Sequence, residues 1–112
     1  MNYSYPSQYE FYEVASVDQL PNGERLFVEI GDEYLVLFNI DGQFFAIADV
    51  CSHDDGPLGD GELDGCEIIC PRHGARFDLR TGKALTLPAV VDIPDYPVRI
   101  QNGCIEIGIP RE

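Results

Sequence analysis

Both histidines of the 112-residue chain and three of its four cysteines lie within residues 51–77. One pair, Cys51 and His53, opens this stretch, and the other, Cys70 and His73, follows after sixteen intervening residues. Cysteine thiolates and histidine imidazoles are the side chains that bind zinc, copper and iron–sulfur clusters in proteins. The two pairs therefore predict a metal centre with these four side chains as ligands.

The spacing of the ligands separates two kinds of metal centre. The ligand count alone allows a mononuclear zinc site with two cysteines and two histidines. A single residue separates Cys51 from His53, whereas two to four residues usually separate neighbouring zinc ligands. Such close ligands suit two adjacent metal ions better than one, and the zinc site stays as the alternative. An arrangement without metal is disfavoured because each of the two histidines lies within three residues of a cysteine.

Apolar runs around these pairs predict β-strands. The segments EYLVLFNI and QFFAIADV flank Asp41-Gly42, and YPVRI and CIEIGI flank Asn102-Gly103. Asp-Gly and Asn-Gly between β-branched and aromatic runs are strong hairpin signals, because both central residues must adopt positive φ. Eleven glycines, eight prolines and the lack of a 3.6-residue apolar repeat argue against a helical bundle. We therefore predict an all-β fold.

Length and composition limit the class of protein. A chain of 112 residues with 45% apolar residues suits a single globular domain over residues 1–112, with an N-terminal extension over about residues 1–10. We expect a monomer. The net charge of −13 argues against binding to nucleic acids and anionic membranes, because like charges repel.

No segment of the sequence resembles a secretory signal or a membrane span. We therefore expect a cytoplasmic protein, in which four cysteines are metal ligands or free thiols rather than disulfides. Cys66 and Cys104, outside the two pairs, are expected to be small buried side chains.

Charged residues divide the site region into two halves. Five acids follow the first Cys/His pair: Asp54, Asp55, Asp60, Glu62 and Asp64. Four of the seven bases lie around and after the second pair: Arg72, Arg76, Arg80 and Lys83. The overall surplus of acids suits either solubility or the attraction of a basic partner.

The pattern Cys-x-His, sixteen residues, Cys-x-x-His resembles the signature of Rieske 2Fe–2S proteins, in which two histidines replace two cysteines on one iron. The resemblance extends from about Tyr12 to Ile109 and includes IDGQFFAIADVCSH, CPRHGARFDLRTGK and LPAVVDIPDYPVRIQNGCIEI. A third loop, which covers the cluster in this family, corresponds to Leu87-Pro88-Ala89.

That resemblance implies a cofactor, its ligands and a fold. The cofactor is one 2Fe–2S cluster, with Cys51 and Cys70 on the inner iron and His53 and His73 on the outer iron. The fold is all-β, with three small antiparallel sheets, and a cluster-binding subdomain over about residues 51–81 is inserted in a base domain.

Departures from the high-potential Rieske proteins of cytochrome complexes favour a soluble, low-potential ferredoxin. Gly56 and Arg72 replace two cysteines that form a disulfide in those proteins. Ala75 and Phe77 replace a serine and a tyrosine whose hydroxyls lie against the cluster sulfurs, and the sequence shows no transmembrane helix. Fewer hydrogen bonds to sulfur disfavour the reduced state, so we expect a midpoint potential on the order of −150 mV.

The resemblance implies an electron carrier that is not an enzyme. Such ferredoxins pass single electrons from a flavin-dependent NAD(P)H reductase to the terminal non-haem iron oxygenase of a multicomponent dioxygenase, and dock transiently with each partner. An oxygenase subunit needs a second, mononuclear iron site, and this chain has no spare histidine to build one. The alternative is a Rieske-fold redox or accessory subunit of another pathway, similar to the nitrite reductase small subunit or associated with iron–sulfur biogenesis.

Overall fold

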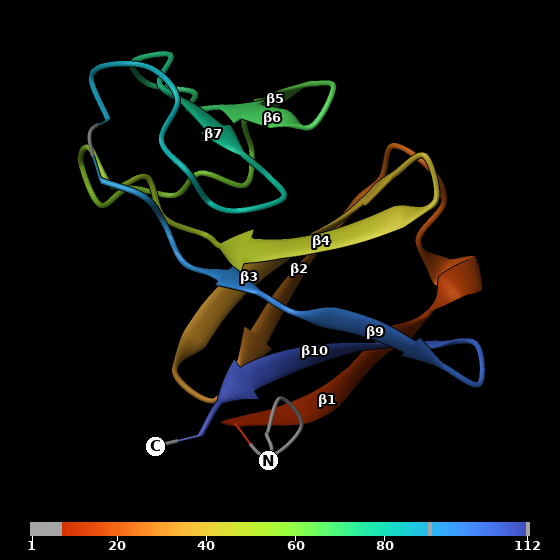
Figure 1. The fold of residues 1–112 in the computed structure, drawn as a ribbon. Helices are drawn as coiled ribbons and strands as arrows, with labels where there is room; N and C mark the ends of the chain where they lie inside the picture. The colour runs from red at the N-terminus through yellow and green to blue at the C-terminus, as the bar shows by residue number, and fades with distance from the viewer. Residues whose placement is uncertain (1–7, 90, 112) are drawn as a thin grey trace.

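The computed structural model of the protein describes residues 8–89 and 91–111 and contains three antiparallel sheets (Figure 1). A four-stranded sheet has the order β2-β3-β4-β8, with bounds β2 (Arg25–Ile30), β3 (Glu33–Ile40), β4 (Gln43–Ala48) and β8 (Asp95–Tyr96). A three-stranded sheet has the order β1-β10-β9, with bounds β1 (Tyr9–Ser16), β9 (Val98–Gln101) and β10 (Cys104–Pro110). The third sheet has the order β5-β6-β7, with bounds β5 (Glu62–Asp64), β6 (Glu67–Ile69) and β7 (Arg76–Asp78).

This architecture confirms the predicted all-β fold of three small antiparallel sheets. The chain leaves the four-stranded sheet at the end of β4, forms β5 to β7, and returns to the sheet at β8. In Figure 1 the small β5-β6-β7 sheet lies above β4, and the β1-β10-β9 sheet lies below β3 and β4. We call the two larger sheets together the base. Within the described residues, no helix is long and apolar enough to cross a membrane.

Both predicted hairpins are confirmed with the expected turn conformations. Between β3 and β4, Asp41 and Gly42 have φ values of 54° and 86°. Between β9 and β10, Asn102 and Gly103 have φ values of 53° and 76°. Positive φ at both central residues matches the turn to the right-handed twist of the strands. The first hairpin delivers β4, and with it the residues that follow, to the candidate site.

Strand β3 is buried on both faces and so belongs to two apolar cores. Leu35 and Leu37 pack in a core between the two sheets of the base. Val36 and Phe38 point to the opposite face and pack in a second core that includes Cys51. A strand that is covered on both faces has a nearly continuous apolar sequence instead of an alternating one, and the segment EYLVLFNI of β3 has this pattern.

The N-terminal extension expected over residues 1–10 falls partly outside the described residues. Residues 1–7 are outside them, whereas Tyr9 and Glu10 lie in β1 and pair with Pro110 and Ile109 of β10. Those two residues therefore form part of the β1-β10-β9 sheet and not of an extension.

Candidate metal centre

Cys51 begins the first ligand loop (residues 51–58), which follows β4. The backbone N–H of Cys51 donates to the carbonyl of Gly56, and the N–H of Asp55 donates to the carbonyl of Cys51, both over 2.7 Å. Asp55 has a φ of 59°, in the left-handed region that Asp tolerates better than most residues. The loop thus closes on itself and leaves Cys51 buried and His53 exposed.

The second ligand loop (residues 70–75) follows β6 and repeats this design. The N–H of Cys70 donates to the carbonyl of Ala75 over 2.7 Å, and the N–H of Gly74 donates to the carbonyl of Cys70 over 3.0 Å. Gly74 has a φ of 76°, which glycine adopts without strain. Cys70 is buried and His73 is exposed, as are their counterparts in the first loop.

The two thiols lie together in the interior. Cys51 and Cys70 are 0% and 1% exposed and belong to the same buried core. Burial raises the pKa of the Cys51 thiol, and the Cys70 sulfur beside it raises that pKa further. Burial also opposes ionisation of Cys70, but the backbone N–H groups of Arg72 and His73 and the Cys51 thiol together lower its pKa. Loss of both protons places two negative charges side by side, which a bound cation stabilises, so this pair suits a metal centre.

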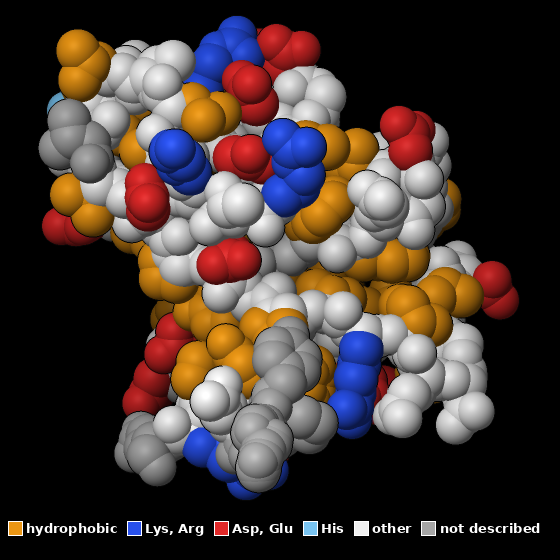
Figure 2. Space-filling model, viewed as in Figure 1, with side chains coloured by type: hydrophobic (Ala, Val, Ile, Leu, Met, Phe, Trp, Pro, Cys, Tyr) orange, Lys and Arg blue, Asp and Glu red, His pale blue; other side chains and the backbone are white. Residues whose placement is uncertain are grey.

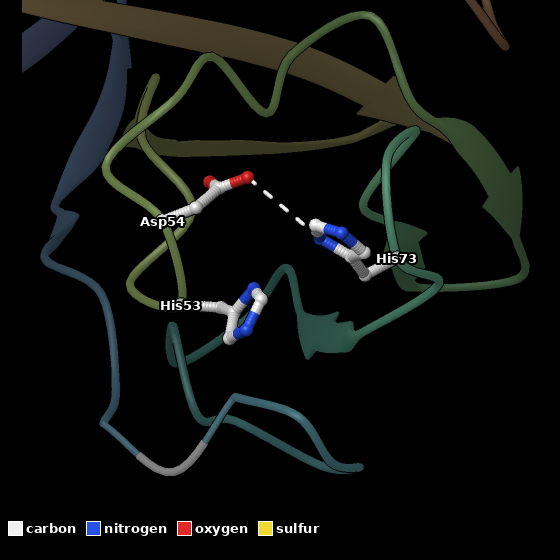
Figure 3. A group of neighbouring side chains, drawn as sticks. All are labelled: His53, Asp54 and His73. Atoms are coloured by element: carbon white, nitrogen blue, oxygen red, sulfur yellow. Dashed lines mark ion pairs between the residues drawn. The ribbon is translucent and has the colours of Figure 1, made fainter.

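The two imidazoles lie together at the surface. The ring centroids of His53 and His73 are 4.9 Å apart, with an interplanar angle of 83°, and the side chain of His73 is 55% exposed. In Figure 3 the two rings approach each other from the two ligand loops. The predicted ligands are thus sorted by depth, with both thiols inside and both imidazoles outside.

Asp54 lies beside the imidazoles and was not among the predicted site residues. Its Oδ2 is 3.9 Å from Nδ1 of His73 (Figure 3), and single ligand atoms of His53, Asp54 and His73 lie within 4.8 Å of one another. Both carboxylate oxygens of Asp54, however, accept hydrogen bonds from Arg72, which holds the pKa of Asp54 well below its usual range. The opposite charges beside the two ligand pairs were the sequence signal for this contact.

Two further residues missed by the sequence analysis anchor the end of the first ligand loop and the segment after it. Oδ1 of Asp49 accepts hydrogen bonds from the N–H groups of Leu58 and Gly59, over 2.9 and 2.7 Å. Nη1 of Arg25, on β2, donates to the carbonyls of Gly59 and Gly61. No spacing rule in the sequence connects a β2 side chain with this segment.

Leu87-Pro88-Ala89, the segment expected to cover the centre, is followed by Val91, which contacts the first ligand loop. Ser52 Oγ donates a hydrogen bond to the carbonyl of Val91. Ala89 is 4% exposed and belongs to the same buried core as Cys51. Leu87 and Val91 are 77% and 60% exposed, so the segment buries one side and presents apolar side chains to solvent.

Ion pairs cover the β5-β6-β7 sheet. Nη1 of Arg76 lies 2.9 Å from Oδ2 of Asp64 and 3.1 Å from Oε1 of Glu67, and Nε of Arg80 lies 3.1 Å from Oδ1 of Asp78. Figure 2 shows Lys and Arg side chains next to Asp and Glu at this end of the molecule. Each of these two arginines therefore has a carboxylate partner close by, and Asp64 is the acid of the first half that Arg76 of the second half contacts.

The remaining cysteines are half-buried rather than fully buried as expected. Cys66 and Cys104 are both free thiols. Burial, followed by the nearby carboxylate of Glu13, raises the pKa of the Cys104 thiol. Neither residue belongs to the buried core that holds the two site cysteines.

The donor set fits a 2Fe–2S cluster better than a single zinc ion. Two buried, adjacent thiols and two exposed, adjacent imidazoles form two separate pairs at different depths. Two metal ions, one for each pair, use that arrangement fully, and mixed Cys2His2 ligation of a 2Fe–2S cluster is the Rieske type.

Comparison with known proteins identifies the class. The model of the "Rieske [2Fe-2S] domain" family matches residues 10–97, and the chain belongs to this family. Its cofactor is therefore a Rieske 2Fe–2S cluster, which confirms the expected cofactor.

The relatives narrow the class to ferredoxins. Over 100 residues the chain is 43% identical to the "3-phenylpropionate/cinnamic acid dioxygenase ferredoxin subunit" of Photorhabdus laumondii, covering 88% of this chain and 94% of the relative. The structure of the "ferredoxin of carbazole 1,9a-dioxygenase" from Nocardioides aromaticivorans is similar with a TM-score of 0.83 and 30% identity, over 90% of this chain and 98% of that one.

A second similar structure contains a ferredoxin together with its oxygenase. It is the complex of reduced oxygenase and oxidized ferredoxin in carbazole 1,9a-dioxygenase, with a TM-score of 0.83 and 27% identity, over 91% of this chain and 95% of that one. These comparisons confirm the predicted resemblance to the ferredoxin components of dioxygenase systems, which are electron carriers and not catalytic subunits.

Proposed function

We propose that Cys51 and Cys70 bind the inner iron of the 2Fe–2S cluster, that His53 and His73 bind the outer iron, and that the protein carries single electrons. The separation of the donors by depth supports this assignment, since the thiols are buried and the imidazoles are exposed. When bound, the cluster supplies one-electron chemistry, because two ferric ions, two sulfides and two thiolates sum to zero charge and an added electron meets no excess negative charge.

The residues of the chain set the direction in which electrons leave. The buried core around Cys51 excludes water from one side of the site. His53 and His73 face solvent, so an imidazole is the part of the site nearest to a docked partner. The exposed side chains of Leu87 and Val91 are attached to the segment that lies against the first ligand loop. These two side chains offer apolar surface near the first ligand loop for transient docking.

The proposed donor is a flavin-dependent NAD(P)H reductase, and the proposed acceptor is a terminal non-haem iron oxygenase. Support comes from the dioxygenase systems to which the similar ferredoxins belong and from the solved ferredoxin–oxygenase complex. We further propose that the protein acts as a monomer in the cytoplasm. Its free thiols suit a reducing compartment.

Rapid mixing of the purified, cluster-containing protein with each partner tests this function. We expect a flavoprotein reductase and NADH to bleach the visible absorption of the ferredoxin, and an oxidised Rieske oxygenase to restore it. With −13 net charge, rates with a basic docking face should fall as salt shortens the reach of charge to about 8 Å at physiological strength. A colourless protein with bound zinc would refute the function. So would a reduced protein that no oxygenase reoxidises.

The low potential expected from the sequence also belongs to this proposal. Ala75 at the end of the second ligand loop and Phe77 in β7 are both 0% exposed and lack hydroxyl groups that donate to sulfur. We expect a midpoint on the order of −150 mV, the low end of the Rieske range. A redox titration measures it, and a midpoint well above zero would place the protein with the respiratory type.

A further inference from the structure

Arg72 makes three side-chain contacts that all lead from the second ligand loop to the first. Its Nε donates to Oδ2 of Asp54 over 2.5 Å, and its Nη2 donates to Oδ1 of the same carboxylate over 2.9 Å. Its Nη1 donates to the carbonyl of Pro57 over 2.7 Å. The guanidinium thus uses both of its edges, one on a carboxylate in a forked contact and one on the backbone.

The acceptor carboxylate is itself held in place by its own loop. Oδ1 of Asp54 also accepts a hydrogen bond from the N–H of Gly56 over 3.0 Å. A Cβ atom at Gly56 would lie 2.8 Å from both Cζ and Nη2 of Arg72. The guanidinium therefore rests directly against the backbone at Gly56, and a side chain there would push it out of position.

These contacts bridge two loops whose backbones otherwise close on themselves. Within the ranges 51–58 and 70–75, which the structure describes completely, every backbone hydrogen bond of Cys51 and Cys70 stays inside its own loop. The other arginines of this region do not bridge the loops: Arg80 pairs with Asp78, two residues away, and Arg76 pairs within the β5-β6-β7 sheet.

We propose that Arg72, Asp54 and the Pro57 carbonyl form an ionic cross-link that fixes the separation of the two imidazoles and thereby slows loss of the cluster. Arg72 and Asp54 are positioning residues, since each is adjacent in sequence to one of the two histidines. The inference rests on the ligand assignment under the proposed function. It concerns the spacing of the loops and not the electron transfer itself.

The cross-link and a simple effect of charge predict different results. Removal of the Arg72 charge lowers the midpoint potential, whereas removal of the Asp54 charge raises it, because a cation stabilises the added electron and an anion opposes it. Opening of the cross-link, by contrast, frees both loops in the same way. Both substitutions should then shorten the lifetime of the cluster and broaden the EPR signal of the reduced protein.

The experiment compares cluster loss from the purified holo-proteins Arg72→Ala, Asp54→Asn and the double variant, followed by visible absorbance in the presence of a chelator. Arg80→Ala is the matched control, because it removes the same charge from an ion pair that stays within one turn. We expect each single variant to lose its cluster about threefold faster or more, the double variant to be no faster than the singles, and Arg80→Ala to match the unmodified protein.

High salt and a conservative variant provide independent measurements. Salt should accelerate cluster loss from the unmodified protein and leave Arg72→Ala unchanged, because only the former has an ion pair to screen. Arg72→Lys keeps the charge without the fork and should lose its cluster faster than the unmodified protein. Unchanged lifetimes in all variants, additive effects in the double variant, or equal effects of Arg72→Ala and Arg80→Ala would overturn the cross-link. A wild-type protein without a Rieske spectrum would instead refute the proposed function.

Discussion

The two ligand loops share one backbone design but are held to the protein in different ways. In each loop the cysteine N–H donates to the carbonyl of the residue five places later. The residue just before that acceptor, which is the fifth residue of the loop counted from the cysteine, has a positive φ: Asp55 in the first loop and Gly74 in the second. The second loop is short and joins β6 to β7, which pair directly with each other. The first loop has no such pair of strands around it.

The first loop depends instead on side chains that reach it from elsewhere. Asp49 accepts the last backbone N–H group of the loop and the one directly after it, and Arg25 donates to two carbonyls in the segment that follows. Two loops with the same closing backbone hydrogen bond are thus positioned in one case by neighbouring strands and in the other by individual polar side chains. Removal of a polar side chain that reaches a loop from elsewhere should therefore harm the first loop more than the second.

At the ligands themselves the two loops should respond alike. Cys51→Ser and Cys70→Ser should each abolish cluster assembly, because serine does not replace the thiolate on a buried iron. Iron content and visible absorbance measure this effect, the largest that we expect. Cys104→Ser, which changes a half-buried cysteine of β10, is the control and should keep the full cluster. Normal iron in either ligand variant would refute the assignment.

The next largest effect should be specific to the first loop. Asp49→Ala leaves the N–H groups of Leu58 and Gly59 without their carboxylate acceptor, at a cost of about 2 kcal/mol. We expect faster hydrogen exchange at these two amides and a lower thermal midpoint of the holo-protein. Asp32→Ala removes an equal charge from the exposed turn after β2 and should change neither. If both variants behave alike, Asp49 is not an anchor.

A smaller effect on stability should distinguish Gly74 from Asp55, the two loop residues with positive φ. Gly74→Ala forces a side chain into the left-handed region at a cost of about 1 kcal/mol, and the open space around that Cβ leaves backbone strain as the cause. The thermal midpoint should fall by about 5 °C. Asp55→Gly should change stability by less than about 0.5 kcal/mol. A larger loss of stability from Asp55→Gly than from Gly74→Ala would contradict the role given to backbone strain at Gly74.

The smallest effect should be electronic and concerns the second loop and the strand β7 that follows it. Ala75→Ser places a hydroxyl at a fully buried position of that loop, and a hydrogen bond to sulfur stabilises the reduced state. We therefore expect a higher midpoint potential with unchanged stability, and the same direction for Phe77→Tyr. Redox titration of both variants beside the unmodified protein measures this shift. A fall in the midpoint would contradict it.

Local patterns in the sequence predicted the hairpins and the grouping of the Cys/His pairs, because their causes are local, whereas the binding of iron by these pairs stays a prediction. Asp41-Gly42 and Asn102-Gly103 require positive φ, and the spacing within each Cys/His pair fixes what one loop can present. The roles of Arg25 and Asp49 were not predictable, since they depend on which strand lies beside the loop. Only the three-dimensional arrangement brings β2 close to residues 59 and 61.

The sequence predicted which charged residues surround the site but not which of them pair with each other. The acidic and basic halves were visible in the sequence, yet the pairing of Arg72 with Asp54 depends on a loop-to-loop distance that no linear pattern reports. Cys66 and Cys104 show the same limit, because their half-burial depends on tertiary packing.

Because β3 is buried on both faces, we expect the amount of folded protein to depend on the supply of iron. Val36 and Phe38 pack in the core of the two site cysteines, while Leu35 and Leu37 pack in the core of the base. Cluster binding, which stabilises only the folded state, therefore also stabilises the base through this shared strand. We expect chains made under iron limitation, which lack the cluster, to unfold and be degraded more often. A cell short of iron would therefore hold less of this protein.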